Sequence, residues 1–163
     1  MTGVHTLVLL RHAKAELAGE DDHARELSPR GRADAAWIGT WLRRQGIVPD
    51  RVVVSTATRT RQTWELADPG GAAPEYDGRV YEAWPRTLRQ IVEETAADVQ
   101  VLALVGHNPG MEQLAAELDD SPQARDLTNS GLPTSAVVVF EVDSWADLST
   151  AVLKELAVPS RRA

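Results

Sequence analysis

The sequence predicts an α/β protein with three layers, in which a mostly parallel β-sheet carries helices on both faces. Four short runs rich in Val and Leu are continuous rather than alternating, as in strands that are covered on both sides. Segments with helical features lie between these runs, so strand and helix alternate along the chain. The chain has 163 residues, 43% of them hydrophobic. This is the size of one domain, and we expect residues 1–163 to form it.

The expected strands are these four apolar runs and two weaker candidates. The four runs are 6–10, 51–55, 101–106 and 136–142. A short strand is expected near 79–82, after a Gly- and Pro-rich segment, 68–78, that we interpret as a loop. The tail at 150–158 suits a strand or a helix by propensity, and we expect an edge strand paired with 136–142.

The expected helices occupy the segments between the strands. The clearest one follows Ser28 as N-cap, has Pro29 in its first turn and closes at Gly46. Further helices are expected at about 57–67, 85–97 and 109–118. Residues 119–135 carry turn formers throughout, and no regular element is expected there.

Composition excludes several classes of function. The chain has no cysteine, so disulfides, thiolate nucleophiles and cysteine-bound zinc are excluded. A net charge of -7, from 24 acidic and 17 basic residues, argues against nucleic acid or an anionic membrane as partner. The first apolar run is too short for a membrane helix or a signal peptide. We therefore expect a soluble, cytoplasmic protein.

Charged and polar side chains stand where the expected strands end. Arg11 and His12 follow the first strand, 55–59 the second, Glu82 the short third one and His107 the fourth. Ligands of open α/β sheets bind beyond the carboxyl ends of the strands. Each of these residues alone is common at the end of a strand. However, two of the four histidines and two arginines lie at equivalent strand ends, and this coincidence predicts a shared site.

Such a set of side chains suits phosphoryl transfer. Guanidinium groups bind phosphate oxygens in pairs, and helix N-termini add N–H donors. One neutral imidazole can attack phosphorus and form a phosphohistidine that water then hydrolyses, while a second stabilises charge in the transition state. This chemistry requires neither a metal ion nor a cofactor.

Several motifs resemble those of the histidine phosphatase superfamily, also called phosphoglycerate mutase-like. RHA at 11–13 is similar to its RHG motif, and STATRTRQT at 55–63 to its S-P-x-x-R-A-x-Q-T segment. GHNPG at 106–110 resembles the motif of its second histidine. LSPRGRADA at 27–35 and PTSAVVVFEV at 133–142 also match, so that the resemblance covers nearly the whole chain.

The resemblance implies roles for four residues. His12 is then the nucleophile, Arg11 and Arg59 bind phosphate, and His107 is the second histidine of the pocket, in contact with the phosphate. It also implies the phosphoglycerate mutase-like fold, here in a minimal form without a large cap.

Two further residues each have two possible roles. Glu82 falls where family members often place a proton donor, but a surface carboxylate after a strand fits equally well. Asn108 either contacts phosphate or caps the helix that follows it. Ala13, Thr56 and Thr60 replace the commoner Gly, Pro and Ala of the motifs, and none of these departures removes a reacting side chain.

The short form of the chain bears on the substrate. Only 47 positions separate Arg59 from His107, and the expected elements fill most of them, which leaves little chain for a lid. An open pocket admits a phosphate carried on a protein surface. The short form, with RHAK and GHNPG, resembles the SixA branch, described as phosphohistidine phosphatases, so a phosphohistidine-bearing protein is the expected partner.

Other interpretations remain open. A broad-specificity phosphomonoesterase of the same superfamily is the nearest, and a phosphoglycerate-type mutase, which needs a closed site, is more distant. A non-catalytic phosphate- or phosphoprotein-binding module belongs to another class, and the complete set of His12, Arg11, Arg59 and His107 speaks against it. A dinucleotide-binding module is weaker still, since no G-x-G-x-x-G follows the first strand.

Overall fold

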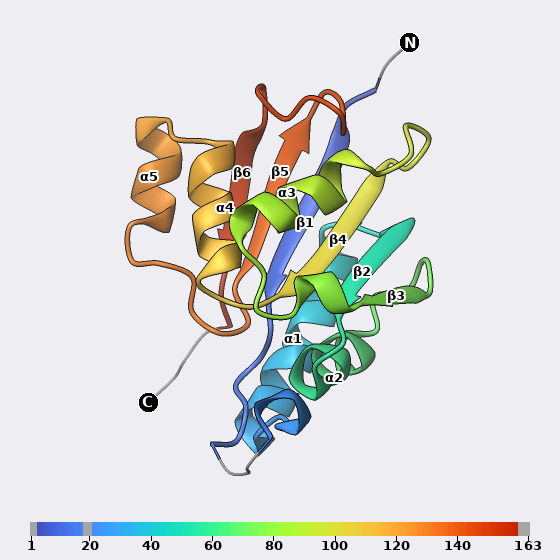
Figure 1. Cartoon of the computed structure of the whole chain (residues 1–163), viewed down its shortest axis with the longest axis vertical. Helices are drawn as coiled ribbons and strands as arrows, with labels where there is room; N and C mark the ends of the chain where they lie inside the picture. Colours follow the sequence, from blue (N-terminus) through green and yellow to red (C-terminus); the bar gives the residue numbers. More distant parts are fainter. Residues whose placement is uncertain (1–2, 18–20, 160–163) are drawn as a thin grey trace.

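The computed structural model describes residues 3–17 and 21–159 and confirms the three-layer architecture (Figure 1). Its sheet has the strand order β3-β2-β4-β1-β5-β6. The strands are β1 (His5–Arg11), β2 (Arg51–Ser55), β3 (Pro74–Asp77), β4 (Val101–Gly106), β5 (Val137–Val142) and β6 (Val152–Ala157). The α-helices are α1 (Pro29–Arg44), α2 (Thr58–Ala67), α3 (Pro85–Glu93), α4 (Gly110–Leu118) and α5 (Pro122–Thr128), with short 3-10 helices η1 (Asp22–Ala24) and η2 (Gly78–Val80).

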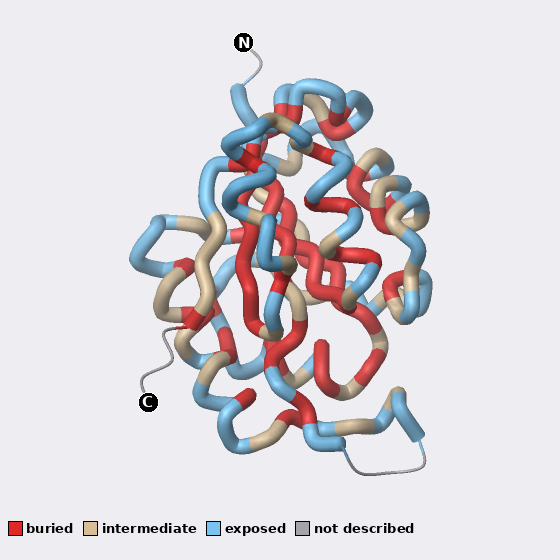
Figure 2. Tube along the Cα trace, turned by 90° about the vertical axis from the view of Figure 1, so that its left-hand side faces the viewer, coloured by how far each residue is buried: buried red, intermediate tan, exposed pale blue. Residues whose placement is uncertain are grey.

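Both faces of the sheet are buried, which explains the continuous apolar runs. Along β1, Leu7 and Leu9 pack in one core with side chains of α3 and α4, whereas Val8 and Leu10 pack in a second core with those of α1 and α2. β4 alternates between the two cores in the same way. Buried residues accordingly concentrate along the central strands, and exposed residues lie on the surrounding helices and loops (Figure 2).

The sheet is mostly parallel, as expected, with an antiparallel edge. β1 pairs with β4, and β2 with both β3 and β4, all in parallel. β5 is antiparallel to β1, and β6 is antiparallel to β5. The expectation of a final edge strand beside 136–142 is therefore confirmed. The carboxyl ends of the four parallel strands meet at one rim of the sheet.

The third strand was predicted at the wrong place. Residues 79–82 form part of η2 and the turn after it, while β3 lies at Pro74–Asp77, inside the segment 68–78 that was expected to be a loop. The apolar signal came from Val80, which is buried in the core from η2 and not from a strand. β3 itself is a polar edge strand that begins with proline, a position where proline is tolerated.

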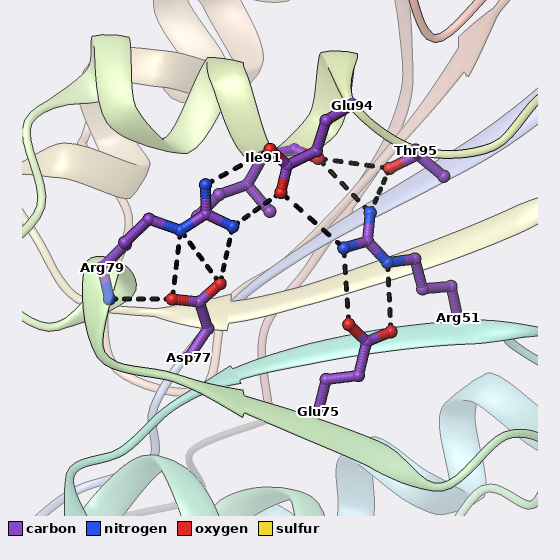
Figure 3. Close-up of polar contacts among 7 residues, drawn as sticks. All are labelled: Arg51, Glu75, Asp77, Arg79, Ile91, Glu94 and Thr95. Atoms are coloured by element: carbon purple, nitrogen blue, oxygen red, sulfur yellow. Dashed lines mark hydrogen bonds and ion pairs between the residues drawn. The ribbon is translucent and has the colours of Figure 1, made fainter.

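A network of ion pairs fixes β3 and η2 against α3 (Figure 3). Arg51 of β2 donates to Glu75 of β3 at 3.1 Å and to the Thr95 hydroxyl at 2.6 Å. Arg79 of η2 donates to Asp77 at 2.7 Å and to Glu94 at 2.6 Å. Charged pairs thus replace apolar packing at this edge, and they hold the backbone that leads to the rim.

The remaining differences concern helix ends and one additional helix. α3 ends at Glu93 rather than near 97, and α5 occupies part of the segment 119–135 where no element was expected. α5 has a sequence signal after all, because the Ser121 hydroxyl caps it and Pro122 is its first residue. Ala124 is its buried residue, so it lacks the apolar face by which a helix is normally recognised.

Two glycines let α1 approach its neighbours closely. A Cβ atom on Gly31 would lie 2.0 Å from the carbonyl oxygen of Lys14, and one on Gly39 would lie 1.5 Å from that of Ala67 at the end of α2. The Ser28 hydroxyl caps α1 by accepting from the Gly31 N–H at 3.0 Å. α1 is thereby held against both the segment after β1 and α2.

We expect Gly39→Ala to destabilise the protein by at least about 1 kcal/mol, because the new methyl group must push α1 away from α2. Alanine's better helix propensity, about 1 kcal/mol, offsets part of this cost. Gly78→Ala is the matched control, since a Cβ there has no heavy atom within 4 Å. Its free energy of unfolding should stay within about 0.5 kcal/mol of wild type in urea titrations. A Gly39→Ala protein as stable as wild type would contradict this packing.

Candidate active site

The ends of β1, β2 and β4 bring the expected side chains into one hollow. Arg11 pairs with Gly106 in the parallel register of β1 and β4, so the two residues that follow, His12 and His107, leave the sheet side by side. The hollow has a volume of about 290 Å³. It is lined by Arg11, His12, Lys14, Ala15, Leu17, Arg25, Arg59, His107, Asn108 and Thr134. Five of the six predicted site residues thus converge, and their chemical roles remain predictions.

His12 is held with one ring nitrogen that makes no hydrogen bond to the described residues. Its Nδ1 lies 2.7 Å from the carbonyl oxygen of Ala13, which can only accept, so Nδ1 carries the proton and Nε2 keeps its lone pair. The ring is buried, with 8% of the residue exposed. Burial and the nearby charges of Arg59 and Arg11 lower the pKa of His12 to about 4, although the bond to Ala13 opposes this change. The imidazole is therefore neutral at pH 7.

His107 lies against His12 and is anchored from β2. Its Nε2 is 2.8 Å from the hydroxyl of Ser55, and the two imidazole centroids are 5.3 Å apart. Burial, and then the proximity of His12 and Arg59, lower the pKa of His107 to about 3. Its Nδ1 is buried without a partner among the described residues. Since the Ser55 hydroxyl can donate to Nε2, Nδ1 can carry a proton for an anion.

The motif residues of α2 place Arg59. Thr63 accepts from the Ala13 N–H at 3.0 Å and donates to the Arg59 carbonyl at 2.7 Å, which ties α2 to the segment after β1. Gln62 accepts from the Leu27 N–H at 2.8 Å, just before α1. The spacing R-x-x-Q-T therefore reflects one helix that points Arg59 to the site and bonds to two other segments.

Arg11 is bound to the loop before β5. Its Nη1 donates to the Leu132 carbonyl at 2.9 Å, and its Nε is buried without a partner among the described residues. Burial lowers the pKa of Arg11, and the nearby Glu112 carboxylate opposes this effect. Glu112 accepts from the Leu132 N–H at 2.7 Å, so the same loop connects the cation to a counter-charge on α4.

Asn108 precedes Pro109, the N-cap of α4, and its side chain bonds to the first turn of that helix. Its Oδ1 accepts from the Glu112 N–H in the first turn of α4 at 3.2 Å, and its Nδ2 donates to the Leu132 carbonyl at 2.8 Å. Asn108 also lines the hollow. Both ends of its amide are thus used within the protein, although Pro109 and not Asn108 is the N-cap, and the predicted phosphate contact remains a prediction.

Glu82 reaches the same rim but is not buried in the hollow. It is exposed, has a left-handed backbone with φ of 54°, and lines a second hollow of about 220 Å³ together with His107, Asn108 and Trp84. It therefore stands beside the second histidine. Its role as a proton donor remains a prediction.

A group of residues around Arg59 belongs to none of the predicted motifs. Asp22 of η1 accepts from Arg59 at 3.1 Å, from Arg25 at 3.0 Å and from the Tyr81 hydroxyl at 2.6 Å. The bonds from Tyr81 and Arg25 hold the pKa of Asp22 well below its usual range, while the same carboxylate raises the pKa of Tyr81 to about 12. Asp22 and Tyr81 are 59 residues apart, and neither belongs to a recognisable motif, so no signal in the sequence joins them.

His23, which matches no motif, also lies here. Its Nε2 is 2.9 Å from the hydroxyl of Thr56, and its ring packs edge-on against Tyr81 with centroids 4.8 Å apart. Tyr81 in turn packs edge-on against His107 at 5.6 Å. The threonine that replaces the commoner proline at position 56 thus contributes a contact to the wall of the site.

The arrangement brings a neutral imidazole, cationic donors and a second imidazole together in one hollow. Within residues 3–17 and 21–159, no group of three or more His, Cys, Asp or Glu side chains could hold a metal ion. In the same part of the chain, no helix has the length and apolar character needed to cross a bilayer.

Known proteins similar to this chain include members of a phosphatase superfamily. The model of the histidine phosphatase superfamily (branch 1) matches residues 7–94. An uncharacterized protein of Mycobacterium tuberculosis is 39% identical over 147 residues, which cover 85% of this chain and 91% of that protein. Solved structures described as phosphohistidine phosphatase SixA, from Agrobacterium tumefaciens and Nakamurella multipartitia, are each 31% identical with a TM-score of 0.84. They cover 95% and 98% of this chain, and the matches span 99% and 98% of the two structures.

We expect nitrogen-detected NMR titration to show His12 neutral, with its proton on Nδ1, from pH 7 down to about pH 4. In urea the unfolded chain should titrate near about pH 6.5. The unfolded state then binds more protons between these two values, so the free energy of unfolding should fall as pH decreases through this window. A midpoint above pH 6 for His12 in the folded protein would contradict the described geometry.

Proposed function

This chain belongs to the histidine phosphatase superfamily and is a phosphatase, and we propose that it removes the phosphoryl group from phosphohistidine side chains of a protein. The observation that carries this proposal is the free Nε2 of a neutral, buried His12 beside two arginines and a second histidine. The likeness to the SixA structures supports the choice of substrate.

In the first step, the lone pair on Nε2 of His12 attacks phosphorus. A P–N bond to His12 forms while the P–N bond to the substrate imidazole breaks, and the departing imidazole takes a proton from water. Arg11 and Arg59 offer N–H groups to the phosphoryl oxygens, and the unpartnered Nδ1 of His107 offers another. These donors stabilise charge on the oxygens in the transition state.

In the second step, water attacks the phosphoryl group on His12. The P–N bond breaks, and His12 regains its lone pair. Inorganic phosphate leaves with the oxygen and protons of the water, and one of these protons neutralises the hydroxide left by the first step. The same guanidinium and imidazole groups bind the oxygens in both steps. Charge neutralisation comes from side chains, so turnover requires no metal ion.

The chain length supports a protein substrate. The residues between α2 and α4 are used by β3, η2, α3 and β4, which extend the sheet and cover one face, so they build no cap over the hollow. Two apolar side chains beside the site are exposed, Leu17 at 89% and Trp84 at 77%. Leu17 lines the hollow, and Trp84 lines its neighbour. A protein surface can contact both, whereas a small metabolite finds few groups to recognise it.

A broad-specificity phosphomonoesterase is the second candidate, and the place of Glu82 favours it. An alkoxide leaving group has a far higher pKa than an imidazole and needs a proton donor. Glu82 shares a hollow with His107 and is exposed to a departing group. The need for Glu82 therefore distinguishes the two candidates.

The decisive test offers a phosphohistidine protein and p-nitrophenyl phosphate to the same enzyme in the presence of EDTA. We expect kcat/KM for the protein to be higher by about 100-fold or more, because remote contacts with the protein contribute binding energy. A preference for the ester, or a strict metal requirement, would contradict the proposal.

Two variants serve as controls. His12→Ala should abolish turnover of both substrates and the acid-labile phosphate label on the enzyme. Glu82→Gln should slow hydrolysis of an alkyl ester such as phosphoserine, whose alkoxide needs a proton, and leave phosphohistidine turnover nearly unchanged. Equal losses on these two substrates would favour the phosphomonoesterase.

A further inference from the structure

Asp22 is the common partner of three side chains at the site. Its carbonyl oxygen accepts from Arg59 Nη1 at 2.8 Å, and its carboxylate accepts from Arg59 Nη2 at 3.1 Å. The other carboxylate oxygen accepts from Arg25 at 3.0 Å, and the first also accepts from the Tyr81 hydroxyl at 2.6 Å. η1, α2 and the turn after η2 therefore meet at this one carboxylate.

A carboxylate at this place weakens the binding of a phosphoryl dianion unless it also positions the groups that bind the dianion. It stands next to the hollow where a phosphoryl dianion is expected to bind, and like charges repel. Arg59 is 6% exposed, and its long side chain must be held in one conformation among several. Two bonds to one residue fix the plane of the guanidinium group, which a single acceptor does not do.

The donors that remain after these bonds suit a phosphate. A guanidinium group has five N–H donors, and Arg59 uses two of them on Asp22. Arg25 is fixed from two sides, because its Nε donates to the Glu16 carbonyl at 2.8 Å while its Nη1 donates to Asp22. Both arginines line the hollow that contains His12. Arg11, Lys14, Arg25 and Arg59 put four cations around the hollow, and the carboxylates of Asp22 and Glu112 oppose them. The two positive charges that remain match a phosphoryl dianion.

We propose that Asp22 is a positioning residue that fixes Arg59 and Arg25 over His12, and that Arg25 is a third phosphate-binding arginine. This inference rests on the proposed phosphatase function but not on the identity of the protein substrate. Tyr81 links Asp22 to the second histidine, because its hydroxyl donates a hydrogen bond to the Asp22 carboxylate while its ring packs against His107.

Asp22→Asn separates positioning from a role in folding. The amide keeps the size of the side chain and the backbone carbonyl that binds Arg59, but it has no charge and one oxygen to serve three donors. We expect kcat/KM for p-nitrophenyl phosphate to fall by about 10- to 100-fold, as for a small misplacement of catalytic groups. The dissociation constant of inorganic phosphate, measured by calorimetry, should rise. The protein should still unfold in one cooperative transition in urea, at a somewhat lower midpoint because the paired carboxylate stabilises the folded state.

The neighbouring carboxylate provides a matched control. Asp21 accepts from the N–H of His23 at 3.0 Å, and it is not among the residues that line the hollow. Asp21→Asn makes the same chemical change one residue away and should keep kcat/KM and phosphate affinity within about twofold of wild type, since surface changes away from a site have small effects.

Double variants test whether Asp22 acts through Arg59. In an Arg59→Ala background, Asp22→Asn should lower kcat/KM by a much smaller factor than it does in wild type. Arg25→Ala should weaken phosphate binding by itself. Equal effects of Asp22→Asn in both backgrounds would overturn the positioning role, and so would tighter phosphate binding by Asp22→Asn, which would make Asp22 a competing anion. A wild-type protein without turnover would contradict the proposed function. The phosphate affinities of the same variants would still decide whether Asp22 positions the arginines.

Discussion

The site depends on one buried hydrogen bond, from Nδ1 of His12 to the carbonyl oxygen of Ala13. This bond chooses the tautomer, and burial among cations keeps the ring uncharged, so that the lone pair on Nε2 is available at neutral pH. A solvated histidine would have neither a fixed tautomer nor a ring that stays uncharged near neutral pH. The segment after β1 is itself fixed, because Thr63 binds the Ala13 N–H and the Lys14 carbonyl lies against Gly31 of α1.

The strand order of the sheet places the other groups around His12. β1 lies beside β4, and β4 beside β2, so His12, His107 and Ser55 reach one rim from three parallel strands. Arg59 lies in the first turn of α2, directly after β2, and so reaches the same rim. The cationic side chains are each oriented by an oxygen acceptor of the protein, Arg11 by a carbonyl and Arg59 by Asp22. Neutral imidazoles and oriented cations are what an anionic substrate requires.

The sequence predicted the buried parts of the fold better than the polar ones. Continuous apolar runs identified the central strands, and the motifs identified Arg11, His12, Arg59 and His107, which do share one hollow. β3 was misplaced because an edge strand held by ion pairs such as Arg51–Glu75 carries no apolar pattern. Asp22 was missed for a related reason. Its importance comes from bonds to Arg59 and Tyr81, which are 37 and 59 residues away in the chain, and contacts of this kind leave no local spacing to recognise.

The position of the phosphoryl group on the enzyme tests this account most directly. The reaction is quenched in alkali during turnover, and the phosphorylated residue and ring nitrogen are identified by mass spectrometry and phosphorus NMR. The account predicts phosphate on Nε2 of His12. Phosphate on Nδ1 of that ring, or on His107, would contradict it, because the hydrogen bond to Ala13 would then not determine which nitrogen reacts.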